Sequence, residues 1–122
     1  MHGPRRNSDI AVIGLACRFP GATTSEEYWK NLCQGIESIT FFSEQELVAA
    51  GVDPSLVANP NYVKAAPLLR DVEMFDASYF GYSPKDAALM DPQHRLFLEV
   101  CWEAFESAGY DPAGCPGKVG VL

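Results

Sequence analysis

Thiols and imidazoles are the side chains in this sequence best suited to nucleophilic or metal chemistry. The chain has four cysteines and two histidines, namely Cys17, Cys33, Cys101, Cys115, His2 and His94. No two cysteines have the CxxC spacing typical of structural zinc sites, so we expect no metal site. Nothing in the sequence indicates secretion, so we expect reduced thiols in a cytoplasmic protein rather than disulfides.

The glycines do not form a phosphate-binding loop. Gly14 and Gly21 do not fit the GxGxxG pattern. Gly117 and Lys118 lack the upstream glycine of a P-loop, because Pro112 stands there, and no serine or threonine follows the lysine. The sequence therefore gives no support to nucleotide binding, and we expect this chain to bind no cofactor.

Composition limits the classes of partner. The chain has 122 residues, of which 48% are hydrophobic and 20% are charged, so it is long enough for one domain with a core. Its formal net charge of -7 argues against nucleic acid or an anionic membrane surface as the main partner. No apolar run is long enough to span a membrane.

The N-terminal region has two parts. Residues 1–8 show no periodicity, and we expect a disordered leader there. Arg5 and Arg6 precede an apolar run as in an export signal, but Asp9 interrupts the flank and Gly14 stands where a lipoprotein signal has a large aliphatic residue. We interpret residues 10–16 instead as a buried strand of a sheet that is covered on both faces.

Two start signals lie in the longest helical pattern, which runs from residue 83 to 109. Ser83 before Pro84 and Asp91 before Pro92 each combine a capping side chain with a proline at the first helical position. They predict a short helix that ends near residue 90 and a longer one over about 92–108, closed by Gly109.

The longer of these helices is predicted to be buried on most sides. Apolar residues recur in it at spacings of three and four, namely Leu96, Phe97, Val100, Cys101, Ala104, Phe105 and Ala108. The polar residues form a narrow strip, which we expect to be its solvated edge, namely Gln93, Arg95, Glu99, Glu103 and Glu106. Arg95 and Glu99 lie one turn apart, as in an ion pair.

The remaining elements are shorter. Thr24 or Ser25 caps a predicted amphipathic helix that ends at Gly35, and residues 43–51 have the serine, glutamate and glycine of a capped helix. Residues 52–60 are interpreted as a loop, and residues 62–76 as extended segments with Pro67 in the middle. Residues 119–122 indicate the opening of another strand. Four aromatic residues are expected to pack against the base of the longest helix, namely Phe75, Tyr79, Phe80 and Tyr82.

Three stretches together resemble the N-terminal segment of a ketosynthase (beta-ketoacyl synthase) domain of a modular polyketide synthase. They are DIAVIGLACRFPGA at 9–22, EMFDASYFGYSPKDAALMDPQHRLFLEVCWEAFESAGYDP at 73–112, and GKVGVL at 117–122. The resemblance extends over residues 9–122. The segment before Phe75 lacks the Gly-Gly-Phe run of the commonest pattern, which leaves the subtype open.

The resemblance implies an α/β chain that is the N-terminal part of a thiolase-like layered αβαβα fold, incomplete in this chain. It also implies a homodimeric enzyme that condenses a cysteine-bound acyl chain, with loss of carbon dioxide, with a malonyl-type extender. The extender is carried on the phosphopantetheine of a partner acyl carrier protein. Such chemistry requires a thiolate and two histidines that stabilise developing negative charge.

The resemblance places those catalytic residues outside this chain. In the family the nucleophile stands in a Cys-Ser-Ser context downstream of the strand that GKVGVL opens, and both histidines follow it. None of the four cysteines matches, so we expect no catalytic, cofactor-binding or metal-binding residue here. His94, Asp91 and Arg95 are interpreted as structural. Two hypotheses remain: the front part of a condensing enzyme, and a free-standing non-catalytic module for docking or dimerisation.

Overall fold

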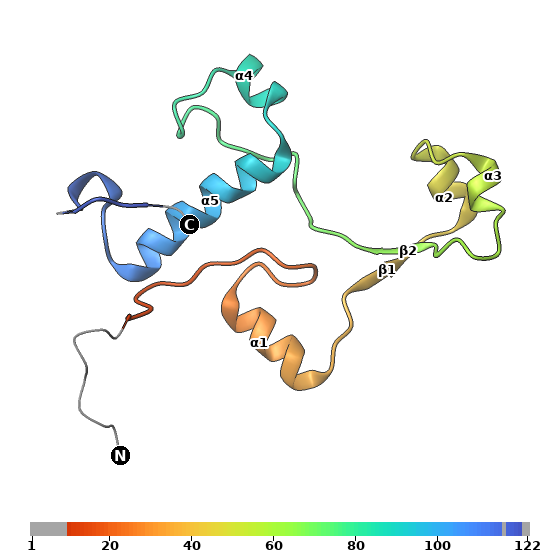
Figure 1. Cartoon of the computed structure of the whole chain (residues 1–122), viewed down its shortest axis with the longest axis horizontal. Helices are drawn as coiled ribbons and strands as arrows, with labels where there is room; N and C mark the ends of the chain where they lie inside the picture. Colours follow the sequence, from red (N-terminus) through yellow and green to blue (C-terminus); the bar gives the residue numbers. More distant parts are fainter. Residues whose placement is uncertain (1–9, 116, 121–122) are drawn as a thin grey trace. The chain divides into compact units, whose positions relative to one another are not determined.

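The chain divides into two compact units. The computed structural model describes residues 10–115 and 117–120. One unit is Arg18–Met74, and the other consists of the described parts of Met1–Cys17 and Phe75–Leu122 (Figure 1). The leader predicted at residues 1–8 lies outside the described residues. No helix among the residues described is long and apolar enough to cross a membrane.

The unit Arg18–Met74 begins with the predicted amphipathic helix. Helix α1, Ser25–Gln34, is capped by Thr24, whose hydroxyl oxygen accepts a hydrogen bond from the Glu27 backbone N–H at 3.2 Å. The carboxylate of Glu27 in turn accepts from the backbone and hydroxyl of Thr23, which lowers the pKa of Glu27. Gly35 ends the helix with φ of 65°, which is the left-handed region that glycine adopts without strain.

A two-stranded ribbon carries the rest of this unit. Strand β1, Ile39–Phe41, pairs antiparallel with β2, Ala65–Pro67, so that Thr40 faces Ala66. Between them lie α2, Glu44–Ala49, and α3, Pro54–Val57 (Figure 1). Lys64 and Glu44 form an ion pair beside the ribbon, and the Val57 side chain is buried. The predicted capping box is confirmed, because the Ser43 backbone N–H donates to the Glu46 carboxylate at 2.7 Å and the Glu46 N–H donates back to the Ser43 hydroxyl.

The second unit is built on the two helices with proline start signals, and both predictions are confirmed. Helix α4 spans Pro84–Leu89 with Ser83 as its cap, and α5 spans Pro92–Ala108 with Asp91 as its cap. Gly109 closes α5 with φ of 73°. A single 3₁₀ turn, η1, follows at Pro112–Gly114.

Several predictions are corrected. Residues 10–16 are not a buried strand: no described segment pairs with them, and Ile10, Val12 and Ile13 are 95%, 85% and 64% exposed. A strand forms only through hydrogen bonds to a neighbour, and apolar residues alone do not supply one. Val119 and Gly120 form no strand either, and residues 121–122 lie outside the described part.

Burial of the longest helix was also predicted wrongly. No residue of α5 is buried, and Phe97 on its apolar face is 49% exposed. Too few described elements pack against the helix to cover an apolar surface of that width. The segment predicted as a loop at 52–60 contains α3, in which Asp53 before Pro54 repeats the start signal of α4 and α5.

Candidate functional site

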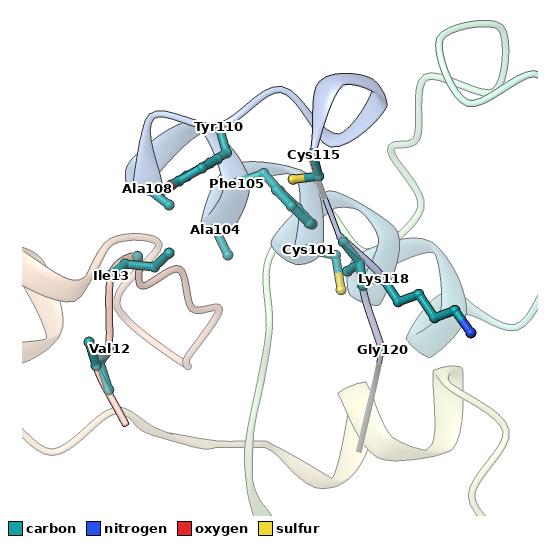
Figure 2. A pocket seen from close by; sticks show the side chains of 13 residues that line it. Val12, Ile13, Cys101, Ala104, Phe105, Ala108, Tyr110, Cys115, Lys118 and Gly120 are labelled. Carbon is teal, nitrogen blue, oxygen red and sulfur yellow. The ribbon is translucent and has the colours of Figure 1, made fainter. Parts of the chain in front are cut away.

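An apolar groove runs along α5 within the second unit. Its volume is about 670 Å³, and Figure 2 shows α5 side chains facing it, with residues of the N-terminal segment and of the chain after η1 on either side. Its lining is Ala11, Val12, Ile13, Gly14, Cys101, Ala104, Phe105, Ala108, Tyr110, Cys115, Lys118, Val119 and Gly120. Among these described lining residues Lys118 is the sole ionisable side chain apart from the thiols and Tyr110, so the surface suits an apolar occupant.

One wall of the groove is held against the helix by Gly14. A Cβ atom added at this glycine would come within 2.8 Å of the Ala108 Cβ and 2.9 Å of the Ala108 backbone nitrogen, and closer still to the carbonyl oxygen of Ala104. Only a residue without a side chain fits at such an approach. The Leu15 backbone N–H, next along the chain, donates to the Ser107 hydroxyl at 3.3 Å. Small residues on both partners therefore fix this segment on α5.

The anchored segment presents apolar side chains that α5 does not cover. Ile10, Val12 and Ile13 are all more than half exposed although Gly14 beside them is closely packed. On the other wall Val119 is 58% exposed. Exposed aliphatic residues gathered around one groove are typical of an interaction surface.

An aromatic cluster covers a different part of α5. Phe75 stacks on Phe80 with centroids 5.1 Å apart, and Tyr79 meets Trp102 edge to face, also at 5.1 Å. The predicted cluster is confirmed, although it contacts the helix at Trp102 rather than at its base. Desolvation raises the pKa of Tyr79, and the carboxylates of Glu106 and Asp76 add to this rise. Trp102 donates its Nε1–H to Glu106 at 2.9 Å.

Capping explains one of the three polar residues singled out near the start of α5. The Asp91 carboxylate accepts a hydrogen bond from the Gln93 N–H at 2.8 Å, as predicted for a cap. His94 is exposed in the first turn, and its backbone N–H donates to the Asp91 carbonyl at 2.9 Å. Arg95 is half-buried.

The cysteines do not gather into a metal site within the part of the chain that the structure describes. Cys101 and Cys115 line the groove, whereas Cys33 is exposed on α1. Within the described residues no group of three histidine, cysteine or acidic side chains is placed to hold a metal ion. Sequence reasoning missed the role of Gly14, although Ala104 and Ala108, one turn apart on the helix, were a signal for close packing of another segment.

Comparison with known proteins gives a consistent result. The model of the family "Beta-ketoacyl synthase, N-terminal domain" matches residues 7–122. A phenolphthiocerol/phthiocerol polyketide synthase of Mycobacterium tuberculosis is 53% identical over 112 residues, which are 92% of this chain and 8% of that protein. Polyketide synthase PksN of Bacillus subtilis is 44% identical over 107 residues, 88% of this chain and 2% of that protein.

Solved structures agree with the sequence relatives. Ketosynthase twelve of the bacillaene polyketide synthase of Bacillus amyloliquefaciens matches with a TM-score of 0.73 and 49% identity. The match covers 82% of this chain and 18% of that one. A Streptomyces albus oxazolomycin ketosynthase domain matches with a TM-score of 0.69 and 33% identity, over 84% of this chain and 18% of that one.

This chain thus spans less than a fifth of each of these relatives. The predicted fold class is confirmed: the chain has the N-terminal part of the thiolase-like fold of ketosynthases. It belongs to the beta-ketoacyl synthase family, as the N-terminal domain segment found in polyketide synthase ketosynthases.

Proposed function

We propose that this chain is the N-terminal scaffold of a ketosynthase that condenses a cysteine-bound acyl chain with a malonyl-type extender, releasing carbon dioxide. The nucleophilic cysteine and the two histidines of that reaction lie in the part of the domain beyond this chain. The contribution of residues 10–120 is to present α5, with the segment that Gly14 anchors on it, as a surface on which the catalytic part is built.

One observation carries the proposal: the family match extends over residues 7–122 without including a cysteine in the nucleophile's context. Cys17, Cys33 and Cys101 are followed by arginine, glutamine and tryptophan, and Cys115 by proline, rather than by two serines. A scaffold role is further supported by the apolar groove, since a surface of this kind favours association over solvation.

The proposal includes the partners that the reaction requires. The extender and the acyl chain arrive on the phosphopantetheine of an acyl carrier protein, so that cofactor belongs to the partner, and this chain itself binds none. The complete domain acts as a homodimer in the cytoplasm, without nucleic acid or a membrane as a partner.

Acylation measured by intact mass tests this function. Incubated with an acyl thioester of N-acetylcysteamine, the chain of 122 residues is expected to carry no stoichiometric acyl group. A chimera in which this chain replaces the matching part of bacillaene ketosynthase twelve should acquire one acyl group, mapped to a cysteine outside residues 1–122, and should condense it with a malonyl carrier protein. A full acyl adduct on one cysteine of the isolated chain would contradict the proposal.

A further inference from the structure

We draw no further inference here: the strongest candidate, the apolar cavity of about 340 Å³ between α1 and the β1–β2 ribbon that is lined mainly by Phe19, Tyr28, Leu32, Ile36, Ile39 and Pro67, carries none because nothing in the structure shows what covers it.

Discussion

Replacing Gly14 by alanine tests the contact on which the groove depends. The new methyl group would meet the Ala108 Cβ at 2.8 Å and its backbone nitrogen at 2.9 Å, and it would also clash with the Ala104 carbonyl. Two of these three atoms belong to the helix backbone, which cannot move aside as the end of a flexible side chain can. The N-terminal segment must therefore lift away from α5.

The expected change in the free energy of unfolding combines two unfavourable terms and one favourable term. Overpacking costs about 1 to 3 kcal/mol, and lifting the segment breaks the hydrogen bond from Leu15 to Ser107, worth about 1 kcal/mol. Against these, an alanine in place of glycine restricts the unfolded chain and stabilises by about 0.4 to 1 kcal/mol. The net loss in the free energy of unfolding should be about 1 to 3 kcal/mol.

Denaturant titration of the ketosynthase chimera measures this loss, with Gly117→Ala as the matched control. Nothing in this chain lies within 4 Å of a Cβ added at Gly117, so no clash with the described residues arises there and the control should cost less than Gly14→Ala. A Gly14→Ala chimera as stable as the control would show that the segment does not lie on α5 as described, and that the groove lacks this wall.

Three further predictions concern burial, pH and association. In the chimera, Phe105→Ala should lower the free energy of unfolding by about 3 to 5 kcal/mol because the groove is covered there. Gln93→Ala, at an exposed position in the first turn of α5, should cost well under about 1 kcal/mol. Equal losses in a denaturant titration would mean that the helix faces the other way. Hydrogen bonds from the Ser43 backbone and hydroxyl lower the pKa of Glu46 below its ordinary value of 4.5. The stability advantage of the natural chain over Glu46→Gln should therefore be present at pH 7 and disappear as the pH falls through the lowered pKa. An advantage that persists in acid titrations would contradict the capping account. Alone, the chain should be oligomeric or aggregated at low micromolar concentration, because its aliphatic residues at 10–13 are exposed to water. A monomer in light scattering with a sharp thermal transition in calorimetry would instead favour a self-sufficient docking module.

Helix boundaries were predictable from the sequence because helix signals are local. The caps Ser43, Ser83 and Asp91 lie within three residues of the N–H groups that they accept from, so the sequence pattern contains both partners. Asp53 and Pro54 give the same start signal for α3. This helix was not predicted because its four residues are too few to show apolar periodicity.

Strands were predicted poorly because their hydrogen bonds join distant residues. Thr40 pairs with Ala66. The alternation in Ile39–Phe41 is only three residues long, and Ala65–Pro67 has none, so the sequence does not reveal the register. The groove was also beyond local reasoning, since Gly14 and Ala108 approach each other across most of the chain. Only the resemblance to ketosynthases, through the stretches around Gly14 and α5, indicated that these segments belong to one fold.

The wrongly predicted burial at residues 10–16 has a physical meaning of its own. A run of aliphatic residues with no polar alternation predicts a strand that is covered on both faces. In the structure α5 packs against this run at Gly14. The side chain of Val12, in contrast, is 85% exposed to water. Helix α5 shows the same imbalance, because its apolar pattern is wider than the surface that the described elements cover. The exposed apolar side chains of residues 10–13 and those of α5 border the same groove. The sequence predicts that these side chains are buried, and in this chain they are not. The groove is therefore the surface on which the rest of a ketosynthase would pack.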